Sequence, residues 1–134
     1  WVMFMKFWNN HEMFFDRVDE VLESETFLWS SIGYAGTVDN ISRMKDGSIL
    51  VIDYKNSRRP KRESWIQDYY LQLASYYVAY YQRSRNIPDG CEIWIANEND
   101  DIPQIFRLSK SDMKYYFEEF RKRLNKYNEI ISNI

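Results

Sequence analysis

Hydrophobic and polar residues follow two different spacings along this chain. Apolar residues recur at the spacing of a helix in segments 64–85 and 110–131, and the apolar segment 1–11 also indicates a helix. We interpret five shorter segments, bounded by turn residues, as strands: 25–29, 34–44, 48–55, 91–97 and 104–108. The predicted order is α-β-β-β-α-β-β-α, which is typical of an α/β sandwich around a mixed sheet.

Turn and capping residues suggest where these elements begin and end. Asp46 and Gly47 are a strong hairpin signal, so residues 45–47 should connect the second and third strands. Residues 56–63, interrupted by Pro60, should form a loop. Ser64 is the expected N-cap of the next helix, and either Ser109 or Ser111 should cap the last one.

The composition favours a folded, intracellular domain. The 134 residues are 45% hydrophobic and 18% aromatic, which argues against disorder, and the length predicts one domain. No apolar run reaches the ~18 residues that a bilayer requires, so we expect no membrane span. Cys91 is the single cysteine, which excludes an internal disulfide and favours a reducing compartment, the cytoplasm or nucleoid. Because the chain begins at Trp1 rather than Met, it is open whether residues 1–134 are part of a longer protein.

The charge of the chain is uneven. A net charge of −2 does not by itself indicate nucleic-acid binding. Residues 57–63, however, contain four bases and one acid, and a local basic loop can contact phosphates. A solvated surface is the alternative interpretation of this loop. A second basic stretch lies at residues 121–123.

Two carboxylates flank the predicted hairpin. A two-residue loop would place Asp39 and Asp53 on opposite faces of the sheet, whereas a three-residue loop with Gly47 in the left-handed region would pair them. Paired residues share a face, with Cβ atoms ~4.5–5.5 Å apart. Lys55 shares the face of Asp53, because strand side chains alternate. The apolar run 49–52 would carry the strand through the core and present both residues at its end.

This combination suits the hydrolysis of a phosphodiester. Carboxylate oxygens bind a hard divalent cation, which activates water and neutralises phosphate charge. The lysine can orient the nucleophile or stabilise developing negative charge. On the following helix, Gln72 and Tyr76 are four residues apart and lie on one face. A buried glutamine needs partners, and a phosphate or the lysine could supply them.

In these motifs the chain resembles the PD-(D/E)XK nuclease superfamily. It is most similar to the RecB-type exonuclease branch, which includes the mitochondrial genome-maintenance exonuclease and phage nucleases. The resemblance covers roughly residues 20–108 and rests on three ordered motifs: Gly33-Tyr34-Ala35-Gly36-Thr37-Val38-Asp39, Val51-Ile52-Asp53-Tyr54-Lys55-Asn56-Ser57 and Gln72-Leu73-Ala74-Ser75-Tyr76. It implies a restriction-endonuclease-like core of order αβββαβ.

The resemblance also implies roles for individual residues. Asp39, Asp53 and the backbone carbonyl of Tyr54 would bind Mg²⁺ or Mn²⁺, assisted by an upstream glutamate. Glu25 is the first choice for this acid, because residues 25–30 are similar to the strand of the branch that carries it, and Glu23 is the second. Lys55 would position the attacking water. Two helix residues, Gln72 and Tyr76, would hold Lys55 or the nucleic acid. The loop residues that would contact DNA are Ser57, Arg58, Arg59, Lys61 and Arg62.

We therefore expect a metal-dependent deoxyribonuclease, acting as an exonuclease on DNA ends in repair, recombination or phage replication. Two alternatives stay open at this point. One is a structure-specific or restriction-type endonuclease on the same core. The other is a domain that binds nucleic acid without cleaving it, which the set of Asp39, Asp53 and Lys55 disfavours.

Overall fold

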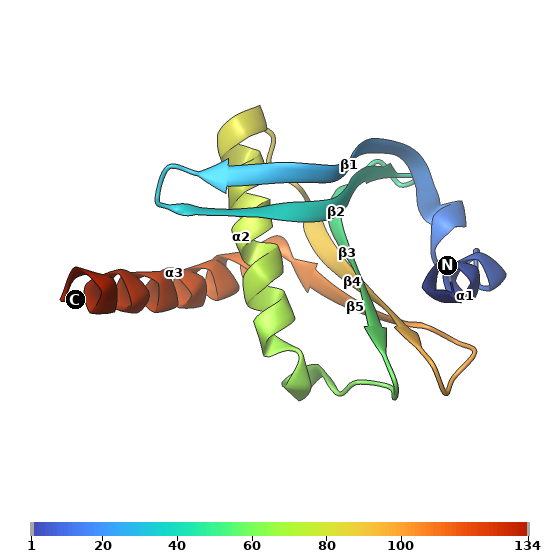
Figure 1. Cartoon of the computed structure of the whole chain (residues 1–134). Helices are drawn as coiled ribbons and strands as arrows, with labels where there is room; N and C mark the ends of the chain where they lie inside the picture. Colours follow the sequence, from blue (N-terminus) through green and yellow to red (C-terminus); the bar gives the residue numbers. More distant parts are fainter. Residues whose placement is uncertain (1, 134) are drawn as a thin grey trace.

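The computed structural model describes residues 2–133, and its helices and strands follow the predicted order (Figure 1). Trp1, the predicted start of the first helix, lies outside the described residues. The eight main elements are α1 (Val2–Asn9), β1 (Val18–Ser30), β2 (Tyr34–Met44), β3 (Ile49–Ser57), α2 (Gln67–Ser84), β4 (Gly90–Asn97), β5 (Gln104–Ser109) and α3 (Lys110–Ser132). Short 3₁₀ turns at Phe15–Arg17 and Glu63–Trp65 precede β1 and α2.

The strands within residues 2–133 form one mixed sheet in which each strand pairs with its neighbours in chain order. Hairpins connect β1, β2 and β3, which are antiparallel, whereas β3 and β4 are parallel. Parallel neighbours need a crossover connection, and α2 provides it. The predicted α/β fold with a mixed sheet is confirmed.

The two faces of the sheet enter separate cores. Val51 of β3 and Ile93 of β4 pack under α2 and α3. The next residue of each strand, Ile52 and Trp94, packs against Phe7 of α1 on the opposite face. Because side chains alternate along a strand, Asp53 and Lys55 belong to the face covered by α2.

The turn between β2 and β3 has the three-residue form. The N–H of Met44 donates to the carbonyl of Ser48 at 2.7 Å, which encloses residues 45–47. Gly47 has a φ of +90°, a conformation that glycine adopts without steric cost. The three-residue prediction is confirmed, and it sets the register of β2 against β3.

Two strands are longer than predicted. β1 begins at Val18 rather than at residue 25, because its first half also pairs with β2 through two register shifts. β3 continues to Ser57, which pairs with Asn97 of β4 and so belongs to the strand rather than to the loop.

The helix starts differ from one another in how they are capped. Ser64 was expected to cap α2, and this is wrong: it lies within the 3₁₀ turn, and α2 begins at Gln67 without a side-chain cap. In α3, Ser109 rather than Ser111 is the N-cap, and it forms a capping box with Asp112. No helix within residues 2–133 is both long and apolar enough to cross a membrane.

Candidate active site

Asp39 and Asp53 meet where β2 separates from β3. Asn40 and Ile52 are the last paired residues of this ladder, so the next residue of each strand, Asp39 and Asp53, stand opposite each other. Oδ2 of Asp39 accepts a hydrogen bond from the N–H of Tyr54 at 2.8 Å, which holds this carboxylate against β3. The two carboxyl groups are close enough for Asp39 to affect the ionisation of Asp53 directly.

The carboxylate of Asp53 is buried, with 5% of the side chain exposed. Burial, together with the neighbouring Asp39 carboxyl, raises the pKa of Asp53 to about 7, although the charge of Lys55 acts in the opposite direction. Nζ of Lys55 lies 3.0 Å from Oδ2 of Asp53 in an ion pair. Apart from this ion pair, Oδ2 has no hydrogen-bond donor among the described residues. Two carboxylates in this position repel unless a cation or a proton lies between them.

Residues of α2 hold Lys55 in place beside Asp53. The Lys55 ammonium donates to Oε1 of Gln72 at 3.1 Å and lies 4.9 Å from the centre of the Tyr69 ring. Nε2 of Gln72 in turn donates to the hydroxyl of Tyr76 at 3.0 Å. The structure therefore brings Gln72 and Tyr76 to the lysine, and it adds Tyr69, to which the sequence interpretation gave no role.

Gly36 allows β2 to approach α2 closely. A Cβ at this position would lie 2.6 Å from Cε1 of Tyr76, which is too close for two carbon atoms. Nearby, the hydroxyl of Tyr34 donates to the carbonyl of Ser75 at 2.9 Å and holds the same strand against the helix. Gly36 was part of the sequence motif, but the sequence alone provided no structural reason for a glycine at this position. A glycine inside a predicted strand is the signal that could have indicated a close backbone contact.

The two acids considered for the upstream position lie in different surroundings. Glu23 forms an ion pair with Arg83 of α2. Glu25, with a φ of +48°, lines a pocket together with Asp39 and Tyr54. Within residues 2–133, no three His, Cys, Asp or Glu side chains gather closely enough to hold a metal ion. Glu25 is therefore a neighbour of the carboxylate pair in this structure, and the expected set of three carboxylates is not assembled.

The residues predicted to contact DNA follow directly after Lys55. Four of these five residues line a cavity of about 620 Å³, namely Ser57, Arg58, Arg59 and Lys61, together with Asn56, Pro60 and Trp65. The guanidinium of the fifth, Arg62, lies over the Trp65 ring. Gln104 of β5 holds this loop, because its side chain accepts from the N–H of Lys61 at 2.7 Å and donates to the Lys61 carbonyl at 2.9 Å.

The two basic stretches of the sequence differ in their pairing. Within the described chain, none of the four basic side chains of residues 58–62 has an ion-pair partner. The three of residues 121–123 are paired with Glu118, Glu119 and Asp68. Residues 58–62 are thus the more available for an anionic ligand.

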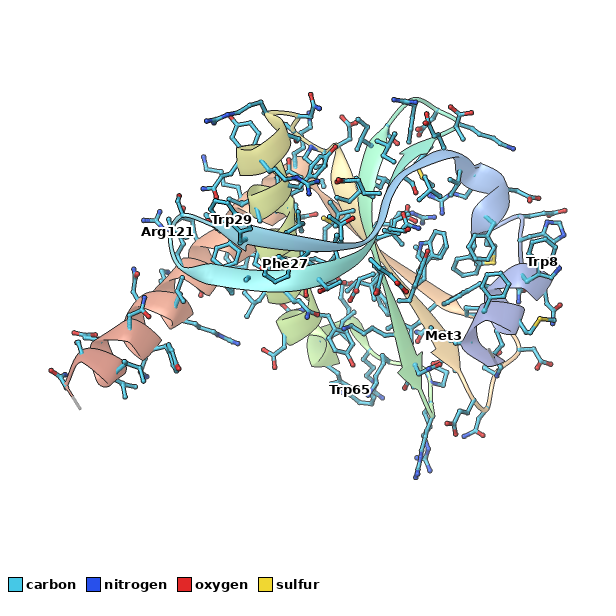
Figure 2. All side chains as sticks on the ribbon, turned by 45° about the horizontal axis from the view of Figure 1, so that its top comes forward. Met3, Trp8, Phe27, Trp29, Trp65 and Arg121 are labelled. Carbon is cyan, nitrogen blue, oxygen red and sulfur yellow. The ribbon has the colours of Figure 1, made fainter. Side chains whose placement is uncertain are left out.

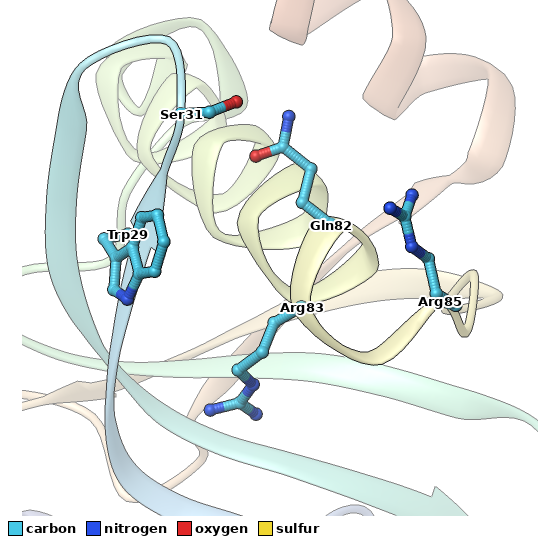
Figure 3. Close-up of a pocket in the computed structure, with 5 residues that line it drawn as sticks. All are labelled: Trp29, Ser31, Gln82, Arg83 and Arg85. Carbon is cyan, nitrogen blue, oxygen red and sulfur yellow. The ribbon is translucent and has the colours of Figure 1, made fainter.

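A second cavity lies at the C-terminal end of α2. It has a volume of about 360 Å³ and is lined by Trp29, Ser31, Gln82, Arg83 and Arg85 (Figure 3). No acid among the described residues lines this cavity, and its Arg83 is already paired with an acid of β1. Gln82 comes ten residues after the glutamine that binds Lys55, which is about 15 Å along a helix. The cavity is separate from the carboxylate pair.

Comparison with known families agrees with this arrangement. A model of the PD-(D/E)XK nuclease superfamily matches residues 9–133. The chain belongs to the PD-(D/E)XK nuclease superfamily, and the resemblance found in the sequence motifs is confirmed at this level. A search of curated protein sequences gave no match.

Solved structures are similar in fold. A crystal structure of a proposed exonuclease from Eubacterium rectale superposes with a TM-score of 0.64 at 11% identity, covering 92% of this chain and 49% of that one. The chain thus spans about half the length of that protein. The structure of SSO0001 is more distant, with a TM-score of 0.47, 15% identity and coverage of 89% and 57%. The first comparison confirms the restriction-endonuclease-like core.

Proposed function

We propose that this chain is a metal-dependent deoxyribonuclease that hydrolyses phosphodiester bonds as an exonuclease at DNA ends. The observation that carries the proposal is the buried carboxyl of Asp53, which adjoins the Asp39 carboxyl and whose Oδ2 has the Lys55 ion pair but no hydrogen-bond donor that satisfies it among the described residues. Buried polar atoms almost always have a partner. A divalent cation would neutralise both carboxylates at once, whereas without it their repulsion is relieved by a proton on Asp53.

The donor set suits a hard cation. Asp39, Asp53 and the backbone carbonyl of Tyr54 would hold Mg²⁺ or Mn²⁺, because both ions prefer oxygen ligands. When bound, such an ion lowers the pKa of water and neutralises charge on the phosphate. Glu25 would assist from the pocket that it shares with Asp39. Two carboxylates and one carbonyl leave coordination positions for water and for a phosphate oxygen.

Lys55 would act on the reacting groups rather than on the cation. Its ammonium is held between Asp53, Gln72 and the ring of Tyr69. The remaining donor capacity of Nζ can orient the attacking water or stabilise negative charge on the phosphate. Gln72, itself held by Tyr76, limits the motion of Lys55, so the ammonium needs little reorganisation during the reaction.

The basic side chains of residues 58–62 would bind the phosphate backbone on its way to the carboxylates. Each such contact adds a salt-dependent term to affinity, even on a chain with a net charge of −2. The description of the structural neighbour supports action as an exonuclease, as does the similarity of the motifs to the RecB-type branch. We place the activity inside the cell, in DNA repair, recombination or phage replication, where the buried free thiol of Cys91 would stay reduced.

A time course on linear and circular DNA, both single-stranded and duplex, tests the proposal. With Mg²⁺ or Mn²⁺, linear substrates should shorten from their ends while circles persist, and a chelator should stop the reaction. Lys55→Ala should lose most turnover but keep its metal affinity in calorimetry. Cleavage of circles would instead indicate an endonuclease. DNA binding without cleavage in any of these metals would indicate a non-catalytic domain.

A further inference from the structure

Trp65 is an exposed aromatic side chain on the short 3₁₀ turn before α2. Its exposed fraction is 61%, although tryptophan has a large apolar surface that folding normally covers. The N–H of Trp65 donates to the carbonyl of Arg62 at 2.9 Å, and the next residue, Ile66, is 1% exposed and anchors the turn in the core. The position of the indole on the surface is therefore determined by the backbone on both sides.

The surroundings of this indole are basic. The guanidinium of Arg62 lies 5.3 Å from the centre of the Trp65 ring, in a cation–π contact. Trp65 also lines the 620 Å³ cavity with Arg58, Arg59 and Lys61, a volume within the usual range for ligand pockets. An aromatic surface next to several cations without ion-pair partners among the described residues fits a ligand that has both a π-face and negative charge. A nucleotide has both features.

The cavity lies next to the proposed catalytic residues along the chain. It begins with Asn56, the residue after Lys55. On its other side, Trp65 comes four residues before Tyr69, whose ring centre lies 4.9 Å from the Lys55 ammonium. Figure 2 shows Trp65 beside the start of α2, well away from Phe27 and Trp29 on the β1–β2 hairpin. A strand whose phosphate reaches Lys55 would thus have an adjacent nucleotide near the indole.

We propose that this cavity, here called the Trp65 pocket, binds one unpaired nucleotide of the substrate, with the base stacked on Trp65 and the phosphate bound by Arg58 and Arg59. Stacking on an aromatic side chain requires a free base face, which a base inside a duplex does not offer. The enzyme should therefore prefer DNA with a single-stranded end to blunt duplex. This inference rests on the proposed function, because it takes the candidate active site as the place where DNA is cut.

The chain contains a matched control for this role. Trp29 is 64% exposed and also lines a cavity with arginine side chains, but at the far end of α2. One of those arginines, Arg83, is neutralised by Glu23. If exposure and nearby arginine were enough for stacking, Trp29→Ala and Trp65→Ala would weaken DNA binding equally.

Binding to the full chain should be measured in chelator, so that no cleavage occurs, with a short fluorescent single-stranded oligonucleotide and a blunt hairpin duplex as probes. Trp65→Ala should weaken binding of the single strand by roughly 5- to 150-fold, and binding of the blunt duplex by less than about twofold. Trp65→Phe should retain most of the affinity, and Trp29→Ala should change neither probe. The salt slope should stay constant in Trp65→Ala, whereas Arg58→Ala or Arg59→Ala should each lower it by about 0.7, because each removes one phosphate-binding cation.

Equal effects on both probes, or unchanged binding of the single strand, would overturn the inference. Thermal unfolding of each variant checks that the fold is intact, and Trp65→Phe keeps the test valid if the alanine variant is unstable. The two proposals fail in different ways. Cleavage by wild type together with unaltered binding by Trp65→Ala removes only the Trp65 pocket. Stacking on Trp65 in a chain that cleaves nothing with any metal removes the nuclease assignment and leaves single-strand binding.

Discussion

Two buried carboxylates lie on neighbouring strands but on opposite faces of the sheet, and their surroundings differ in kind. Glu92 of β4 has 3% of its side chain exposed, similar to the 5% of Asp53 in β3. Arg17 donates to both oxygens of Glu92, at 3.0 and 2.6 Å. The indole N–H of Trp94 donates to Oε1 at 2.9 Å, and Arg107 approaches Oε2 at 3.3 Å. Both carboxylate oxygens of Glu92 are buried away from water, and both accept hydrogen bonds from protein donors instead.

Asp53 has no comparable set of partners. It faces the carboxyl of Asp39, has one lysine beside it, and leaves a buried oxygen without a donor among the described residues. Burying a charge is unfavourable unless it is paired and hydrogen-bonded, and Glu92 meets this condition whereas Asp53 does not. The comparison separates a carboxylate that stabilises the fold from one whose environment is suited to binding a cation. Four predictions test it, beginning with the largest expected effect.

Removing the charge of Asp53 should abolish cleavage without destabilising the fold. Asp53→Asn removes a proposed metal ligand at nearly constant volume, so cleavage should fall by at least about a thousandfold, since several kcal/mol of charge stabilisation disappear. The urea midpoint of the metal-free protein should be unchanged or higher, because a buried charge next to Asp39 has been removed. Undiminished activity in this variant would refute the assignment.

Glu92→Gln should have the opposite effect, a loss of stability without a loss of cleavage. It leaves the Arg17 guanidinium without its carboxylate, and breaking a buried pair costs about 3–5 kcal/mol. Urea unfolding should show this destabilisation, while the folded fraction keeps its activity per molecule. Arg107→Ala is the control, because its side chain is 64% exposed and such an ion pair contributes less than about 1 kcal/mol. Loss of activity in folded Glu92→Gln protein would contradict the division between the two carboxylates.

The metal-free protein should become less stable as the pH rises. Burial raises the pKa of Asp53 from 3.8 to about 7, so the folded state binds this proton more tightly than the unfolded state. The resulting stabilisation is complete below about pH 4 and is lost as the pH passes through about 7, at up to about 1.4 kcal/mol per pH unit.

Urea midpoints of wild type and Asp53→Asn in chelator, measured from pH 4 to pH 8, isolate this effect from other titrating groups. The two proteins should diverge as the pH rises, with wild type the less stable. Mg²⁺ added at pH 8 should stabilise wild type and not the variant. Parallel pH curves would show that Asp53 is ionised in the folded state at low pH.

The smallest expected effect concerns the packing that positions Lys55. Gly36→Ala would press a methyl group against the ring of Tyr76, with a cost to stability of about 1–3 kcal/mol. Because Tyr76 holds Gln72, and Gln72 holds Lys55, kcat should fall by about 10- to 100-fold, with little change in KM. Reduced stability with normal kcat would mean that Tyr76 does not position the lysine.

Several features of this chain could be predicted from its residues before any fold was known: the order of the elements, the three-residue turn with Gly47, and membership of the PD-(D/E)XK superfamily. These features depend on short-range information, namely periodicity, turn residues, and motifs that keep their spacing. The same information indicated Asp39, Asp53 and Lys55 as neighbours, because one hairpin connects them and its register follows from the turn.

Only the folded structure shows which residues from distant parts of the chain surround each of the two buried carboxylates. Glu92 and Arg17 are 75 residues apart, and no local pattern relates them. Ser64 satisfied the rule for an N-cap, but the path of the chain into α2 placed it in a 3₁₀ turn. Local rules describe what a residue favours, whereas burial and pairing depend on which other segments pack against it.

The same reason explains the two glutamates of β1. Both fitted the upstream motif, and the sequence contains no information on which of them Arg83 would pair with. Glu23 pairs with that arginine, whereas Glu25, which has a positive φ, lines a pocket with Asp39 without joining the carboxylate pair. The sequence determines the chemistry of each side chain. Its hydrogen-bond and ion-pair partners depend on the packing of segments that only the folded chain brings together.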